Sequence, residues 1–389
     1  MANTQTLTGF TELIYEARDI VLREPVGFAS SVLVNSGSEG VSLGGTVKSF
    51  VAGQPTLNTD HTPAMTVPAG DDMTSTVEEM TIGQVARVNI PLKGETVRQL
   101  DNTVGRQNFV NNVLAQGIRQ IVNAIESHIG STAKLGSSRA VGTAGTTPFA
   151  SAHALIPQAN QILTDNGAPV DNQRSLVLST GAATNLKTLS HIYKVNEAGS
   201  AETLRSGVLL DIDGVAIKQS AGVNSHTKGA GASYVINNGN ITVGSTTISI
   251  DGGTVNTTGF KAGDIVTIAD EPTASKYVVK TGLTATSGNI VIQNPGLRGA
   301  IVDGKAVTIG DSYTANMLFH RSAIELVCRP PAMPDGGDLA EDRMTVFDPT
   351  SGLVFEVALY KGYGMNLMEI VCYYQAKVWK PELVATLLG

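Results

Sequence analysis

The six histidines of this chain are the first residues to consider for chemistry, because imidazole serves both as a metal ligand and as a general base. They are His61, His128, His153, His191, His226 and His320. Their positions show no ligand spacing, and neither an HExxH motif nor a closely spaced cysteine pair accompanies them. We therefore predict no metal site and name no metal ligand.

The two cysteines, Cys328 and Cys372, are too few for a disulfide framework. We expect free, partly buried thiols in a protein made in a reducing cytoplasm. The sequence does not open with a charged segment followed by an apolar one, and no apolar run approaches the ~20 residues that cross a bilayer. We expect no membrane partner.

Three glycine-containing stretches could bind phosphate or calcium, and each has a plainer interpretation. "GKAVTIG" lacks the lysine followed by serine or threonine that completes a P-loop. "GAGAS" (229–233) has no strand–helix unit around it, which favours a flexible linker over a nucleotide fingerprint. "DIDG" (211–214) lacks the bidentate acid of a calcium loop and indicates a hairpin turn. We predict no cofactor and no cofactor-binding residue.

Two pairs of acidic residues could perform acid–base chemistry, namely Glu78 with Glu79 and Asp71 with Asp72. They lie in a polar segment that offers no apolar pocket to separate their pKa values. A solvated acidic tip, or a contact with a basic patch on a neighbouring molecule, is the favoured interpretation. The serine-rich stretches contain no nucleophile elbow. We predict no catalytic residue, and an enzyme would require a pocket that unites distant residues.

Composition limits the class of partner. The chain has 389 residues, a formal net charge of −7, 16% charged residues and 42 glycines. The sequence contains no basic stripe that could neutralise the phosphates of DNA. The nearest candidates, Lys187 with Lys194 and Lys377 with Lys380, are interpreted as ordinary solvated pairs. We therefore expect contact with DNA to be weak and not sequence-specific. The low content of charged residues is typical of a glycine-rich β protein, or of a subunit whose surface is covered by other copies of the same chain.

Hydrophobic periodicity predicts how the first third of the chain is organised. Apolar residues at helical spacing over 13–21 indicate a helix that Pro25 ends. Segments around 47–51 and 81–90 alternate like strands and flank about thirty residues without a helical period. This pattern is typical of a long two-stranded ribbon with an extended tip, which must either move freely or lie on a neighbouring molecule.

A long amphipathic helix over 106–129 is the strongest element, and Gly130 is a candidate for its C-terminal stop. A second helix is expected over 150–163. "RSLVLST" then indicates a buried strand and "GAATNLKTLSHI" a short helix. Further strands are expected after residue 311, so the predicted fold class is α+β.

Residues 221–311 differ from the rest, because short β-rich segments follow one another at the spacing of a small β-barrel or sandwich. "GFKAGDIVTIAD" (259–270) supplies one of these strands. No helical period occurs there, and the mixed pattern resumes afterwards. We therefore expect an all-β domain inserted into a host domain.

The order of these elements resembles the tailed-bacteriophage major capsid proteins of the Hong Kong 97-type fold. The matching residues are Arg174, Leu176, Val177, Leu178, Leu204, Arg205, Gly207 and Gly214. "KAGDIVTIA" is similar to the inserted β domain in coat proteins of short-tailed phages that infect Salmonella and its relatives. The resemblance implies a structural shell subunit.

The resemblance also implies a division of the chain. The expected parts are an N-terminal arm and helix (1–45), an extended β-ribbon loop (46–95), a peripheral domain with a spine helix (96–149), the first part of an axial domain (150–220), an inserted β domain (221–311), and the second part of the axial domain with the C-terminal segment (312–389). Some family members link Lys and Asn side chains between subunits. Lys48 and Lys93 flank the ribbon but no lysine lies at its tip, so this chemistry is not carried over.

The implied partners are copies of the chain in hexamers and pentamers, a scaffolding protein, a portal, an optional decoration protein and enclosed double-stranded DNA. The scaffolding protein is expected to be separate, because the sequence shows no protease cleavage signal and no long scaffolding segment. The implied location is the virion capsid, assembled in the bacterial cytoplasm. Two alternatives stay open, namely a secreted or surface β-rich adhesin or fibre subunit and an encapsulin-like compartment shell.

Overall fold

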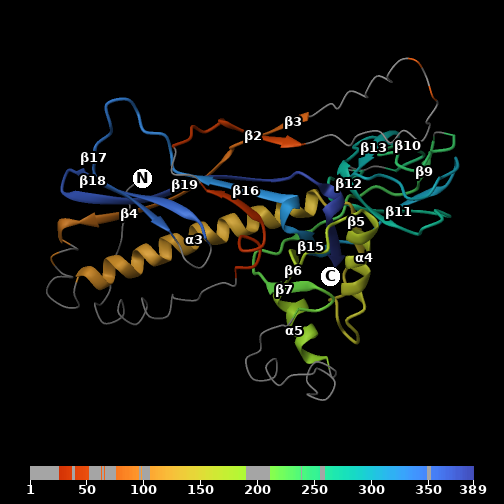
Figure 1. Ribbon diagram of the computed structural model, residues 1–389, viewed down its shortest axis with the longest axis horizontal. Helices are drawn as coiled ribbons and strands as arrows, with labels where there is room; N and C mark the ends of the chain where they lie inside the picture. The colour runs from red at the N-terminus through yellow and green to blue at the C-terminus, as the bar shows by residue number, and fades with distance from the viewer. Residues whose placement is uncertain are drawn as a thin grey trace.

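The computed structural model describes residues 26–36, 40–51, 63, 65, 76–95, 98, 106–189, 211–237, 239–254, 259–347 and 352–389. Within them the fold is mixed α and β and rich in strands (Figure 1). The helix expected over 13–21 lies outside the described residues. None of the helices in these ranges is long and apolar enough to cross a membrane.

One sheet is built around the long strand β19. Its members are β1 (Leu33–Ser36), β16 (Ile324–Arg329), β19 (Met365–Val378), β18 (Val354–Gly362), β17 (Ala340–Phe347) and β4 (Gln84–Lys93). β4 pairs along one side of β19, while β18 and β16 follow each other along the opposite side. β19 is therefore hydrogen-bonded along both edges. The long helix α3 (Arg106–Leu135) runs along this sheet (Figure 1).

Helix α3 continues beyond its predicted end. Gly130, expected to stop the helix, lies inside it, and the helix ends before Gly136, whose N–H bonds to the carbonyl oxygens of Thr132 and Ala133. A Cβ at position 130 would lie 2.7 Å from the carbonyl oxygen of Gly222. The glycine therefore allows a loop to approach the helix closely, which is a different use of the residue from ending a helix.

A second sheet forms the centre of the molecule. Its central strands are β5 (Arg139–Val141), β20 (Val384–Leu388), β15 (Tyr313–His320), β6 (Arg174–Leu178) and β7 (Val215–Gln219), and the short β8 (Ser225–His226) pairs with β15. β6 and β20 are buried along their whole length, which confirms the prediction for "RSLVLST". The short turns η1 (Arg321–Ala323) and η2 (Pro381–Leu383) precede β16 and β20.

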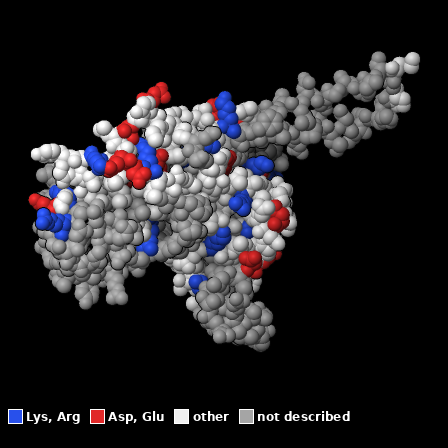
Figure 2. Space-filling model, turned by 60° about the vertical axis from the view of Figure 1, so that its left-hand side comes forward, with Lys and Arg blue, Asp and Glu red and all other residues white. Residues whose placement is uncertain are grey.

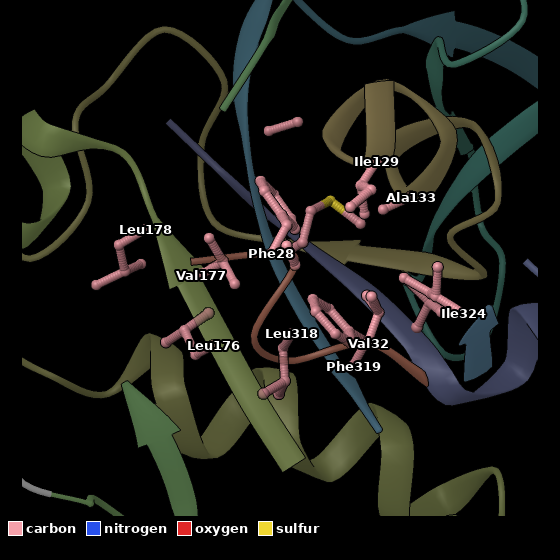
Figure 3. Packing of buried hydrophobic residues seen from close by; sticks show 14 of the residues in the cluster. Phe28, Val32, Ile129, Ala133, Leu176, Val177, Leu178, Leu318, Phe319 and Ile324 are labelled. Atoms are coloured by element: carbon pink, nitrogen blue, oxygen red, sulfur yellow. The ribbon is translucent and has the colours of Figure 1, made fainter. Parts of the chain in front are cut away.

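Two shorter helices accompany this sheet. α5 (Thr180–Thr188) follows β6 as predicted, and the Ser179 side chain accepts a hydrogen bond from the Ala182 N–H at its start. α4 (Leu155–Asp165) begins later than the predicted helix over 150–163. In the core beneath them, Phe28 lies between Ile129 of α3 and Val177 of β6, so the start of the described chain is part of the core (Figure 3).

The same sheet continues into a closed β unit. Its strands are β9 (Tyr234–Ile236), β10 (Thr247–Asp251), β11 (Ile265–Ile268), β12 (Lys276–Thr281), β13 (Gly288–Ile292) and β14 (Ala306–Ile309). β11 pairs with both β14 and β12, so the six strands close into a ring. The ring encloses an apolar cluster of its own, and β12 pairs with β5 to connect it to the central sheet. The described residues between 221 and 311 contain no helix.

The predicted ribbon exists but is built from a different return strand. β2 (Thr46–Val51) and β3 (Thr76–Thr81) form a two-stranded sheet of their own, which lies along the upper side of the molecule in Figure 1. The alternating segment predicted over 81–90 instead belongs mainly to β4, which pairs with β19. The segment does alternate as a strand should, but that strand belongs to the main sheet and not to the ribbon.

Candidate functional site

The base of the ribbon rests on a small apolar cluster, here called the ribbon seat. The seat consists of Met80, Ile82 and Val327, with Val41, Val47, Tyr373 and Trp379 packed against it. Met80 and Ile82 come from the ribbon side and are almost completely buried. Backbone hydrogen bonds of Ile82 with Gly44 and Gly45 close the ribbon at this end. The ribbon is therefore joined to the body by a compact apolar contact.

A lysine of the central strand β19 adds polar contacts beside the seat. Lys377 Nζ lies 3.0 Å from Glu78 Oε2 and donates to the carbonyl oxygen of Glu79 at 2.9 Å. The same ammonium lies 4.3 Å from the ring centroid of Trp379, whose Nε1–H donates to Glu325 Oε2 at 2.7 Å. The prediction that Lys377 is an ordinary solvated lysine is wrong, because it binds the ribbon.

Glu78 and Glu79 have separate partners, although they are neighbours in β3. Glu78 reaches across to the body, whereas the Glu79 carboxylate pairs with Lys48 on the facing ribbon strand at 3.0 Å. Neither forms an acidic tip or an acid–base pair, because both bind lysines of their own chain at the base of the ribbon. Asp71 and Asp72 lie outside the described residues.

The segment 259–270 contains a second structural centre at Asp264, which is fully buried. Its carboxylate accepts hydrogen bonds from the N–H groups of Lys261 at 2.7 Å and Gly229 at 3.1 Å. His226 Nε2 lies 2.7 Å from the same carboxylate. Because His226 and Gly229 lead into the β unit, Asp264 fastens the entering chain to the turn before β11.

The chain leaving the β unit meets the same turn. The Tyr313 hydroxyl donates to the carbonyl oxygen of Gly263 at 2.7 Å, and its ring lies against His226. Burial, together with the negative charge of Asp264, raises the pKa of Tyr313 well above its ordinary value. The entry and exit of the β unit are therefore held together by one buried polar cluster, which the sequence did not reveal.

The stretch "GAGAS" is part of this junction, and its interpretation as a flexible linker is wrong, because its two glycines pack closely and Gly231 and Ala232 form backbone hydrogen bonds. Gly229 is buried, and a Cβ there would lie 2.2 Å from the carbonyl oxygen of Gly259. A Cβ at Gly231 would lie 2.7 Å from the ring of Tyr234. Glycine is needed at both positions because backbone and ring approach too closely for any side chain.

A buried carboxylate on the spine helix fixes the beginning of the described chain. Glu126 is 2% exposed, and its oxygens accept hydrogen bonds from the N–H groups of Gly27, Phe28 and Ala29 at 2.6–3.2 Å. The Ser220 hydroxyl donates to it at 2.7 Å. Such charge-assisted bonds are the strong ones in proteins. Residues 27–29 are therefore fixed to α3.

The histidines are single residues with structural partners where the structure describes them. His320 is the most suggestive, because its ring nitrogens lie 2.9 Å from Asp171 and 2.8 Å from the Ser322 hydroxyl. The nitrogen that faces this serine also accepts the N–H of Ser322, so His320 caps the short turn η1. That nitrogen is already occupied, which argues against its use as the base of a nucleophilic serine.

The remaining sequence candidates also have structural explanations. Cys328 and Cys372 are both fully buried, more than predicted, and the hydrogen bond with Cys328, together with burial, raises the pKa of the Cys372 thiol. In "DIDG", Asp213 and Gly214 have positive φ and form the expected turn before β7. His61 and His191 lie outside the described residues.

No group of metal-binding side chains occurs in the described ranges. Over the described part of the face shown in Figure 2, charges of both signs are scattered among uncharged residues. The described residues also show three geometric features. They are a projecting ribbon with a defined base, a long helix beneath a sheet, and a β unit fastened at its entry and exit.

Comparison with solved structures identifies where this arrangement occurs. No protein-family model and no curated protein matches the sequence. A chain of Mycobacterium phage Che8 aligns over 100% of this chain and 98% of its own length, with 14% identity and a TM-score of 0.51. The two chains share a fold.

Two further structures align along the whole chain at lower scores. The capsid structure of cyanophage P-SCSP1u covers 100% of this chain and 91% of its own, with 13% identity and a TM-score of 0.49. The mature capsid of bacteriophage PhiM1 covers 100% and 90%, with 11% identity and a TM-score of 0.47.

Proposed function

We propose that this chain is a structural major capsid protein of a tailed bacteriophage, which assembles with copies of itself into the icosahedral shell around double-stranded DNA. The observation that carries the proposal is the fold shared along the full length with the Che8 phage chain. The projecting ribbon β2–β3 and the long helix beneath a sheet support it, as do the element order and motifs of the sequence.

The proposed fold is of the Hong Kong 97 type, with an inserted β domain. Residues 1–45 are the arm, 46–95 the extended loop and 96–149 the peripheral domain. The axial domain comprises 150–220 and 312–389, and the inserted domain is 221–311. The closed ring β9–β14, with its own apolar cluster and one buried junction, supports a domain that leaves and re-enters its host at adjacent points.

Assembly follows from the shape of the ribbon. A shell needs heterologous contacts that close, made by one sequence in slightly different environments. Within the described residues, β2 and β3 form a sheet only with each other, which leaves backbone groups at the ribbon edges available to a neighbouring subunit. A long arm of this kind provides contact area while tolerating changes in the angle between subunits.

The proposed partners are copies of this chain in hexamers and pentamers, a scaffolding protein, a portal and an optional decoration protein. The DNA is held without sequence-specific contact, because a net charge of −7 opposes adhesion to phosphates. The protein acts in the virion capsid after assembly in the bacterial cytoplasm, and it is not an enzyme. An adhesin or fibre subunit is not favoured, because the full-length likeness is to a phage chain and the element order of the sequence resembles that of phage shell subunits.

Negative-stain electron microscopy of the expressed chain, alone and with a scaffolding protein from the same genome, tests the proposal. We expect closed shells in at least one of the two preparations. A folded monomer in both, or fibres, would contradict the proposed function. Circular dichroism of the same material shows whether the chain is folded when no shells are seen.

A further inference from the structure

The direction in which the ribbon leaves the body needs an explanation beyond its apolar seat. The seat holds the base of the ribbon by burying Met80 and Ile82. Apolar burial is not directional, so it resists separation more than it resists rotation. In the described part of the chain, β2 and β3 form no hydrogen-bonded ladder with the main sheet. Among these residues, the backbone ties the ribbon to that sheet only at its base, through the bridge of Val41 with Pro331 and the two residues between β3 and β4.

The polar contact that crosses from the body to the described part of β3 is made by Lys377. Its ammonium binds the Glu78 carboxylate and the carbonyl oxygen of Glu79, which are a side-chain and a backbone group of consecutive residues. Because one ammonium binds two groups of β3, the contacts restrict the orientation of β3 relative to the body as well as its distance from it. Directional bonds of this kind can therefore provide what the seat lacks.

Lys377 is itself held in place. It belongs to the part of β19 that pairs with β16, where it lies opposite Glu325. Glu325 is 8% exposed and accepts hydrogen bonds from Trp379 Nε1 and from Asn35 Nδ2 of strand β1. The lysine stem and the indole ring lie together, because the ammonium is positioned over Trp379. The donor is thus part of a fixed network that also includes the N-terminal strand.

We propose that Lys377 and Glu78 form the positioning contact that sets the angle at which the ribbon leaves the sheet, and through it the fit of the ribbon on a neighbouring subunit. The part that concerns the neighbour rests on the proposed shell function. The angle itself is a property of the isolated subunit. This separation allows the two claims to be tested independently.

The expected effect is selective because the pair is partly exposed. The side chains of Lys377 and Glu78 are 34% and 44% exposed, and such ion pairs change an equilibrium constant by up to about fivefold. Removing the pair should therefore leave subunit stability nearly unchanged while allowing the ribbon a wider range of angles. A residue with a purely structural role would show the opposite pattern.

The chain contains a matched control in the adjacent residue. Glu78→Gln removes the contact with the body, whereas Glu79→Gln removes an ion pair of equal length with Lys48 within the ribbon. Both variants lose one negative charge from the same strand. Spin labels at Val77→Cys on the ribbon and Thr345→Cys on β17, both exposed, report the distance from ribbon to body in the unassembled subunit.

We expect a broader distance distribution for Glu78→Gln than for the wild type or Glu79→Gln. Raising the salt from about 0.1 to 1 M should broaden the wild-type distribution towards that of Glu78→Gln, because salt screens exposed ion pairs. Identical distributions for the two variants would overturn the positioning role.

Shell assembly provides the second readout. Glu78→Gln should reduce the yield of closed shells by up to about fivefold relative to Glu79→Gln, with unchanged urea midpoints for both. Equal yields would refute the link to the neighbouring subunit. Failure of the wild type to form shells both alone and with the scaffolding protein would refute the proposed function, while the spin-label result would still decide the positioning role.

Discussion

Replacing Asp264 with asparagine should loosen the β unit at its junction with the body. The substitution preserves size, so its effect comes from hydrogen bonding and charge. Asp264 is fully buried, and its carboxylate accepts N–H groups of Lys261 and Gly229 and contacts His226. An asparagine offers one oxygen and turns an NH2 group towards donors, which leaves at least one buried donor without an acceptor.

The magnitude follows from these contacts. A hydrogen bond to a charged group contributes about 1.5–3 kcal/mol, and a buried donor left unpaired costs about 1–3 kcal/mol. We expect Asp264→Asn to lower the local opening free energy by about 3 kcal/mol, which is roughly a hundredfold in the opening equilibrium. Amide hydrogen exchange measured by mass spectrometry over 259–281 should accelerate by that factor.

Asp270 provides the matched control for this experiment, because it lies in the same segment but is exposed. Its carboxylate pairs with Lys305 at 2.6 Å, with 74% of the aspartate side chain exposed. Asp270→Asn should leave exchange over 259–281 nearly unchanged, since exposed ion pairs contribute little. If Asp264→Asn and Asp270→Asn accelerate exchange equally, the junction is not held by Asp264 and the reasoning fails.

Three further predictions concern the anchor, the helix and the ribbon. Glu126→Gln should lower the free energy of unfolding, measured by urea denaturation, by about 2–4 kcal/mol. The reason is that the single amide oxygen of glutamine cannot replace a buried carboxylate that accepts four hydrogen bonds. A loss below about 1 kcal/mol would contradict the role of Glu126 as an anchor. Burial lowers the pKa of His128 from 6.5, so the unfolded chain binds a proton more readily and stability should fall as the pH drops below about 6.5. His128→Phe, which keeps a ring against Tyr374, should flatten that slope, and an unchanged slope would exclude His128 as its source. Deleting residues 55–72 should leave a folded subunit by circular dichroism but abolish closed shells in electron micrographs, and normal shells would refute the role of the ribbon.

Local pattern was sufficient for the elements whose contacts are close in sequence. The buried strand β6, the helix α5 behind it and the strands of the closed ring all follow from periodicity and turn residues. The helix α3 was also evident, but its end was misplaced. Gly130 is a signal for a helix stop and for close packing alike, and only the position of Gly222 decides between the two.

The functional geometry could not be predicted, because it depends on residues far apart in the chain. Lys377 and Glu78 are 299 positions apart, and Glu126 lies 98 positions from Phe28. A single sequence shows Lys377 and Glu78 as isolated charges, so solvation is the natural interpretation of both. The return strand of the ribbon was misassigned for a related reason, because two alternating segments do not reveal which partner each of them pairs with.

A cryo-electron microscopy map of the assembled particle tests the central claim most directly. We expect a closed shell in which ribbon β2–β3 projects from its seat and is covered by a neighbouring copy of the chain. Shells in which the ribbon contacts only its own subunit would contradict the proposed assembly contact. Particles without a closed shell would contradict the proposed function itself.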